Sequence, residues 1–248
     1  MASPTSEVFE QGFEEGDFHA LGDLVNRDGQ YNDRRLVTRH KLGALSKEAA
    51  KRLAEAGLEL EPRTSLHHPH QFNDNRVRRM WAYLVRPKKE KARLKRTLGA
   101  DLAKDLDAAY KNAYLCLALE ADFLEVSLRI HIDAWYDGQN LKRHYEGGAQ
   151  RELLDLLNAL PGFRLRLDNW KGEWLCGQLT PEKLAEFFRY YTPGEHSLAV
   201  ESRWPAPPGN RAAALGPEVP EALLAALTSL APLYRWAAWS QESEYLFG

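Results

Sequence analysis

Three histidines fall within four positions of the segment SLHHPHQFNDN, at His67, His68 and His70. Imidazole is a favoured ligand of zinc and other transition metals, and histidines two or three residues apart in an extended loop can share one ion. The pattern therefore predicts a divalent-metal site that is completed from elsewhere in the chain. The candidates for the remaining ligands are Asp74, His131 and Asp133. The alternative is a loop that the histidines only brace, because no metalloprotease or zinc-finger spacing is present.

A second group of chemically active side chains lies on one predicted strand, over residues 123–133. Apolar and polar residues alternate along it, so the polar ones share a face. These polar residues, with one acid that follows the strand, are Glu125, Ser127, Arg129, His131, Asp133 and Asp137. A histidine two positions from a carboxylate on one face suits proton transfer. The candidate catalytic residues are therefore His131, Asp133, Glu125 and Asp137. The alternative is the solvated face that antiparallel sheets commonly have.

The histidine loop and this strand face would together make a metal-dependent, nuclease-like hydrolase if the fold brought them to one cleft. The restriction-type nuclease signature, an acid two positions before a lysine, does not occur. Its nearest matches are Glu61-Pro-Arg63 and Glu201-Ser-Arg203. The motifs GxGxxG, GxxxxGK[ST], GxSxG and CxxC do not occur either. Their absence disfavours dinucleotide enzymes, P-loop NTPases, α/β-hydrolases and zinc ribbons.

The densest run of cations lies between Arg76 and Arg96, where ten basic side chains stand against a single acid, Glu90. Such a density suits contacts to phosphates, whose affinity comes from counterion release. Trp81 and Tyr83 share one face of the intervening strand, where their rings could stack on bases. The predicted nucleic-acid-binding residues are Arg76, Arg78, Arg79, Trp81, Tyr83, Arg86, Lys88, Lys89, Lys91, Arg93, Lys95 and Arg96.

The formal charge of −2 conceals an uneven distribution. Residues 1–33 carry one basic and eight acidic side chains. Residues 34–104 carry nineteen basic and seven acidic side chains, and residues 105–248 carry thirteen basic and twenty acidic side chains. The basic middle predicts binding of DNA, RNA or another polyanion. The alternative is a non-catalytic interaction protein, whose basic block docks on acidic partners or on its own acidic ends. The seven tryptophans would also suit a self-association surface.

The composition is that of a globular chain of 248 residues, long enough to bury a core without disulfides or metals. Cys116 and Cys176 lie among apolar residues, which suggests buried thiols in a reducing compartment. The start of the chain does not resemble a signal peptide, and no apolar run has the length of a membrane helix. We therefore expect a cytoplasmic protein with no membrane contact. The scarcity of isoleucine, confined to Ile130 and Ile132, suggests a GC-rich bacterial genome.

The elements that must position these residues follow from periodicity and turn residues. Helices are expected over residues 46–57, 88–110, 151–160, 181–191 and 220–239, and strands over 80–86, 113–119, 123–133, 163–178 (a hairpin) and 196–204. This order predicts an α+β fold, with a mainly antiparallel sheet built from hairpins and flanked by helices. We expect one domain over residues 1–248, with residues 1–45 an irregular N-terminal segment and residues 205–217 a loop before the C-terminal helix.

Overall fold

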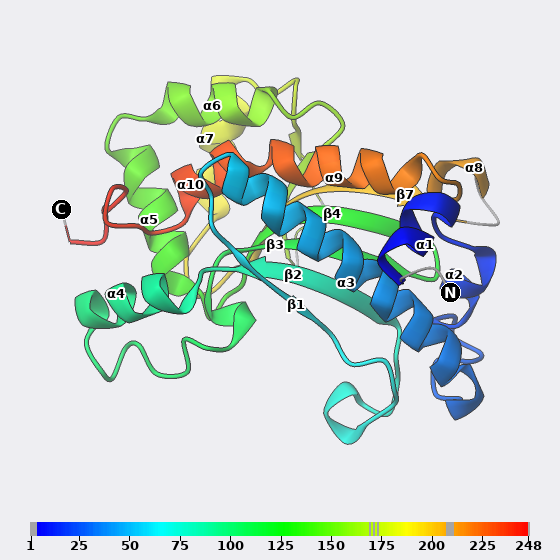
Figure 1. Cartoon of the computed structure of the whole chain (residues 1–248). Coiled ribbons are helices and arrows are strands. Elements are labelled where there is room, and N and C mark those ends of the chain that lie inside the picture. The colour runs from blue at the N-terminus through cyan, green and yellow to red at the C-terminus, as the bar shows by residue number, and fades with distance from the viewer. Residues whose placement is uncertain (1–3, 169, 171, 173, 207–210, 248) are drawn as a thin grey trace.

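The centre of the molecule is a seven-stranded sheet with the strand order β1-β2-β3-β4-β7-β5-β6 (Figure 1). The computed structural model describes residues 4–168, 170, 172, 174–206 and 211–247. The strands are β1 (Glu61–Thr64), β2 (Arg79–Val85), β3 (Tyr114–Glu120), β4 (Phe123–Ile130), β5 (Arg164–Leu167), β6 (Trp174–Leu175) and β7 (Leu198–Pro205). Every strand pair described is antiparallel, which confirms the predicted α+β class.

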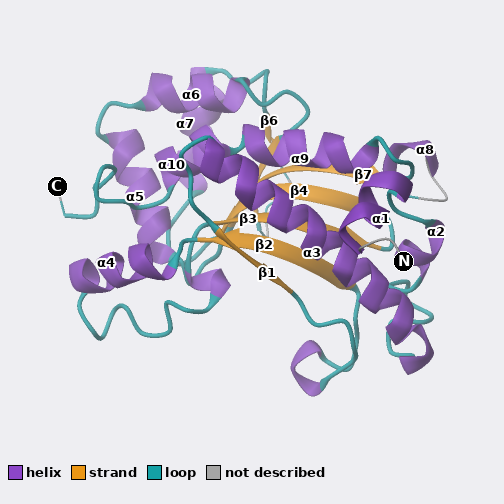
Figure 2. Cartoon of the chain, viewed as in Figure 1, coloured by secondary structure: helices purple, strands orange, loops and turns teal. Residues whose placement is uncertain are grey.

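The helices lie before, between and after these strands. They are α1 (Pro4–Gln11), α2 (Glu15–His19), α3 (Asn32–Glu55), α4 (Lys88–Leu98), α5 (Trp135–Glu146), α6 (Gln150–Asn158), α7 (Pro181–Tyr190), α8 (Arg211–Ala214), α9 (Val219–Ser229) and α10 (Ala231–Ala237). Figure 2 shows α3 and α9 lying across the strands, with α5, α6, α7 and α10 grouped at one end of the sheet. In the described part of the chain, no helix is long and apolar enough to cross a membrane.

The helices α3 and α9 pack on the apolar face of the sheet. Leu45 and Leu53 of α3 and Leu224 of α9 are fully buried there, in one core with the inward positions of the central strands. Those positions are Met80, Ala82 and Leu84 of β2, Leu115, Leu117 and Leu119 of β3, and Leu124, Val126, Leu128 and Ile130 of β4. Because side chains alternate along a strand, the residues between them point to the opposite face of the sheet.

The N-terminal segment differs from its prediction, because α3 begins at Asn32 and not at Ser46. In the first half of α3, the buried residues before Leu42 are polar and are held by polar contacts. Arg35 is fully buried and donates to the carbonyls of residues 20, 25 and 28. Lys41 donates to the buried carboxylate of Asp17 at 2.9 Å. Hydrophobic periodicity cannot reveal a helix whose packing is of this kind.

Three other boundaries also differ. Helix α4 ends at Leu98, before Gly99 with a φ of 83°, although the leucine spacing continues to Leu106. Residues 135–146, which follow the strand expected over residues 123–133, form helix α5. The C-terminal helix is divided into α9 and α10. In the predicted loop 205–217, residues 207–210 lie outside the described residues, and residues 211–214 form α8.

Candidate functional site

The three loop histidines lie in a protruding segment between β1 and β2 that closes on itself (Figure 1). His70 N donates to Asn73 Oδ1 at 2.7 Å, and Asn73 Nδ2 donates to His68 O at 3.2 Å. The rings of His67 and His68 meet edge to face with centroids 5.2 Å apart. Burial, followed by the positive charge of Arg39, lowers the pKa of His67. The neutral ring of His67 therefore adds little positive charge at pH 7.

The candidate catalytic residues His131 and Asp133 lie at the other end of the sheet. The histidine loop leads into Arg79, at the start of β2. The end of β2, at Val85, lies beside Tyr114 of β3, and Tyr114 lies beside Arg129 of β4. His131 follows Arg129 by two positions, so it lies near the end of β2. At about 3.3 Å per residue, the length of β2 separates the two groups by about 20 Å.

These positions do not assemble the metal site or the hydrolase cleft that the residue types suggested. His131 Nδ1 lies 3.5 Å from Asp133 Oδ2, and both side chains are at least two-fifths exposed. The His131 ring otherwise meets the ring of Tyr110 edge to face. Among the described residues, no group of three or more His, Cys, Asp or Glu side chains is arranged to hold a metal ion. The prediction of a metal at His67, His68 and His70 therefore has no support in the arrangement of the fold.

Asp137, a further catalytic candidate, is instead a buried structural anchor. Its Oδ1 accepts hydrogen bonds from Arg86 Nη2 and from the backbone N–H of Trp239, both at 2.8 Å. Its Oδ2 accepts from the backbone N–H of Ala113 at 2.7 Å. Arg86 also donates to the carbonyl of Trp239 at 2.9 Å. This cluster joins the end of β2, the start of β3, α5 and the C-terminal segment.

Arg86 must therefore be removed from the predicted nucleic-acid-binding residues. Its side chain is only 3 % exposed, and its charge is neutralised by Asp137. Lys91 is also buried, with its Nζ 3.7 Å from Asp107 Oδ1. Both predictions fail for the same reason: a local run of cations does not show which of them the fold buries.

The remaining cations of the basic segment divide into two groups at opposite ends of β2. Arg76 and Arg78 lie before the strand, where Arg78 pairs with Asp23 at 3.2 Å. Arg76 pairs with Asp74 at 3.7 Å. After the strand, α4 carries Arg93, which is paired with Glu90, and four exposed cations. These four, called here the α4 cations, are Lys88, Lys89, Lys95 and Arg96. Within the described residues none of the α4 cations forms an ion pair.

A groove runs beside the α4 cations, between α4 and the segment that precedes β3. Lys88, Lys91 and Lys95 line one wall, while Asp105 and Asp107 lie among the residues of the other. Tyr110 also lines the groove. The groove therefore has charges of both signs, and the other two α4 cations, Lys89 and Arg96, are not among its lining residues.

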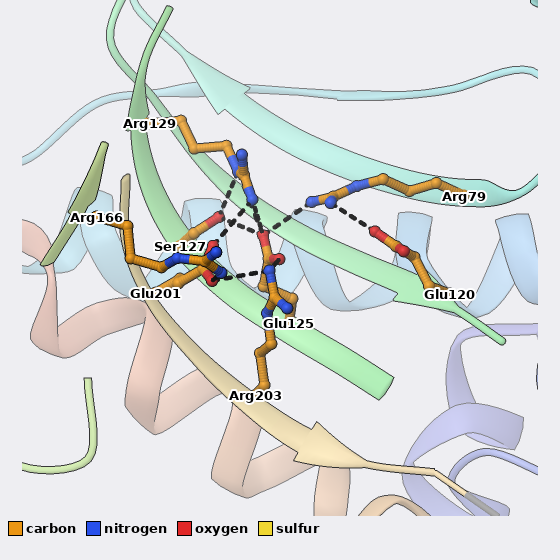
Figure 3. A network of polar contacts seen from close by, with 8 residues as sticks. All are labelled: Arg79, Glu120, Glu125, Ser127, Arg129, Arg166, Glu201 and Arg203. Carbon is orange, nitrogen blue, oxygen red and sulfur yellow. Dashed lines mark hydrogen bonds and ion pairs between the residues drawn. The ribbon is translucent and has the colours of Figure 1, made fainter. Parts of the chain in front are cut away.

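The sheet face opposite α3 and α9 carries an ionic network whose centre is Glu125. Glu125 Oε1 accepts hydrogen bonds from Arg79 Nη2 (2.8 Å), Arg129 Nη2 (2.5 Å) and Ser127 Oγ (2.9 Å). Arg203 Nη2 lies 3.4 Å from Glu125 Oε2. Figure 3 shows these side chains converging from β2, β4 and β7. Three strands are therefore joined on this face by one buried carboxylate.

A second buried carboxylate extends the network toward β5. Glu201 Oε1 accepts from Arg166 Nη1 at 2.7 Å and lies 2.8 Å from Arg203 Nη2. Glu201 Oε2 accepts from Arg129 Nη2 at 3.2 Å. At the other end, Arg79 donates to Glu120 at 2.7 Å. We call this set the arginine network: Arg79, Glu120, Glu125, Ser127, Arg129, Arg166, Glu201 and Arg203 (Figure 3).

In the arginine network, the two central carboxylates are buried and the arginine side chains around them are partly exposed. The side chains of Glu125 and Glu201 are 0 % and 4 % exposed, whereas those of Arg129 and Arg203 are 25 % and 38 % exposed. Burial alone would raise the pKa of Glu125. The charges of Arg79 and Arg129 and their hydrogen bonds outweigh it and bring this pKa to about 2. Glu125 is therefore an ionised anchor and not a proton donor near neutral pH.

The sequence indicated part of this network and missed the rest. Strand alternation placed Glu125, Ser127 and Arg129 on one face, as the structure has them. The triplet Glu201-Ser-Arg203 was noted only as a weak nuclease match, yet Glu201 lies opposite Ser127 and Arg203 lies opposite Glu125. In each of the two strands, charged residues two or four positions apart share one face. This spacing was the sequence signal that could have predicted the network.

No protein-family model matches the chain, and a search of curated proteins found no match. The function must therefore be argued from the site itself.

Proposed function

We propose that this protein binds nucleic acid or another polyanion through the exposed cations that lie around the end of β2 and along α4. The observation that carries the proposal is the set of four α4 cations, which are exposed and form no ion pair within the described residues. Cations of this kind can release counterions from a phosphate backbone, which is the main source of such affinity. A cytoplasmic location and a bacterial origin belong to the same proposal.

Two of the four α4 cations are placed against helix stability, whereas Lys95 and Arg96 lie in the last turn, where the helix dipole favours positive charge. Lys88 and Lys89 occupy the first turn of α4, where the helix dipole disfavours positive charge. This cost is explained if the two lysines serve a ligand outside the chain.

The arrangement supports external binding better than docking on the chain's own acidic ends. The N-terminal acids Glu14 and Asp17 pair with Arg34 and Lys41, which belong to α3. Of the basic segment, Arg78 pairs with Asp23 of the acidic N-terminal residues. From the acidic later part of the chain, Asp107 pairs with the buried Lys91, and the α4 cations are left without an ion pair within the described residues.

We expect the triple variant K88Q/K89Q/K95Q to bind nucleic acid with a weaker salt dependence than the unaltered protein. If each lysine contacts one phosphate of a single strand, the slope of log K against log salt should become shallower by about 2. The measurement is fluorescence anisotropy with a labelled oligonucleotide across a salt series.

The matched control is K47Q/K51Q/K183Q, which also removes three exposed lysine charges, two from α3 and one from α7. This control should keep the original slope. An equal effect of both triple variants would mean that only net charge matters, and it would reject α4 as the binding site.

A further inference from the structure

The face of the sheet that carries the arginine network also presents aromatic rings. Trp81 and Tyr83 of β2 lie opposite Ala118 and Cys116 of β3. Trp81 is 38 % exposed, and the Tyr83 ring meets the Tyr114 ring edge to face at 6.1 Å. These cross-strand neighbours of the two rings have small side chains. These residues make a shallow aromatic platform on β2 and β3.

Cations border this platform on both sides. Arg63 of β1 lies opposite Tyr83, and its side chain is 39 % exposed. Arg129 of β4 lies opposite Tyr114 on the other side. The two central carboxylates of the network, Glu125 and Glu201, are buried, whereas Arg129 is partly exposed. Above these two carboxylates an approaching ligand therefore meets guanidinium groups first, whereas Glu120 at the border of the network is 32 % exposed.

The platform is also continuous with α4. The backbone N–H of Lys88 donates to Glu61 Oε1 of β1 at 3.1 Å, so α4 starts beside the edge strand. Arg63 and Glu61 both act electrostatically on Lys91 of α4. An extended anionic chain could thus pass from the platform across β1 to the α4 cations.

We infer that the platform binds single-stranded nucleic acid, with a base stacked on Trp81 and phosphates held by Arg63 and Arg129. This inference rests on the proposed function and names its substrate class. Aromatic residues two apart on one strand lie about 7 Å apart on the same face, and they suit the unstacked bases of a single strand. A duplex hides the faces of its bases, so it cannot use the Trp81 ring in this way.

The test compares a fluorescein-labelled fifteen-residue oligothymidylate with a blunt duplex of the same length, at one low salt concentration. We expect W81A to weaken binding of the single strand roughly tenfold to a hundredfold, and to leave duplex binding within about twofold. W81F, which keeps a ring, should restore most of the loss. The control is W170A. Trp170 is 41 % exposed and lies between β5 and β6, at the opposite edge of the sheet from β1, so its replacement should change neither affinity.

The outcomes separate the two proposals. Binding of neither ligand by the unaltered protein would reject the proposed function. Binding of both ligands with no selective effect of W81A would reject the platform and leave the role of α4 standing. If W81A does not fold, crosslinking of a bromouridine oligonucleotide to the unaltered protein decides the matter. Crosslinks within residues 79–85 are expected, and crosslinks confined to other segments would overturn the inference.

Discussion

Replacing Asp137 by alanine is expected to destabilise the protein by about 3–5 kcal/mol, the usual cost of removing one partner from a buried ion pair. The substitution would leave Arg86 charged and buried without its counter-ion. It would also remove the acceptor of the Ala113 and Trp239 backbone N–H groups. The measurement is urea unfolding followed by circular dichroism, in which the midpoint should fall without a change of slope.

The control is D155A, which breaks the exposed pair between Arg151 and Asp155 on α6. Exposed pairs of this kind contribute at most about 1 kcal/mol. The double variant R86M/D137L, which removes both charges, should be less destabilised than D137A. A stability of D137A within about 1 kcal/mol of the unaltered protein would contradict the structural role assigned to Asp137.

Replacing Glu125 by glutamine is expected to change how the free energy of unfolding depends on pH. The pKa of Glu125 is lowered in the folded protein to about 2 from an ordinary 4.5. As the pH falls, the unfolded chain therefore takes up this proton first. The stabilisation from Glu125 is fully present above about pH 4.5 and is lost as the pH falls toward 2. The shift corresponds to about 3 kcal/mol.

We therefore expect E125Q to be less stable at pH 7 by about 3 kcal/mol, because Arg79 and Arg129 lose their central counter-charge. The difference from the unaltered protein should shrink steadily between pH 5 and pH 2. Urea midpoints over that pH range measure it, with E152Q at an exposed position of α6 as the control. A constant difference over the whole range would show that Glu125 is not held ionised by its arginines.

The antiparallel sheet was predictable because its information is local. In β4, polar and apolar residues alternate, and this period shows which side chains share a face. The same pattern could not show that Glu125 is buried. Besides Ser127 and Arg129 of its own strand, its partners come from β2 and β7, and only the strand order brings Arg79 and Arg203 to it.

The positions that were wrong depend on contacts distant in sequence. Asp137 was a candidate for catalysis because it follows a polar strand, yet it is neutralised by Arg86, 51 residues away. The first half of α3 has no clear apolar stripe. Its polar side chains Arg35 and Lys41 are buried by hydrogen bonds to residues 17–28, and these contacts cannot be read from the sequence of the helix. A sequence pattern shows which charges occur, while the fold decides which of them remain available to a ligand.

The central claim is that unpaired cations on α4 bind a polyanion, and the most direct test is the salt dependence of binding by the unaltered protein. Affinity for a labelled single-stranded oligonucleotide should fall linearly on a plot of log K against log salt. Four contacts from the α4 cations predict a slope of about −3. Failure to bind at low salt, or an affinity that does not change with salt, would contradict the claim.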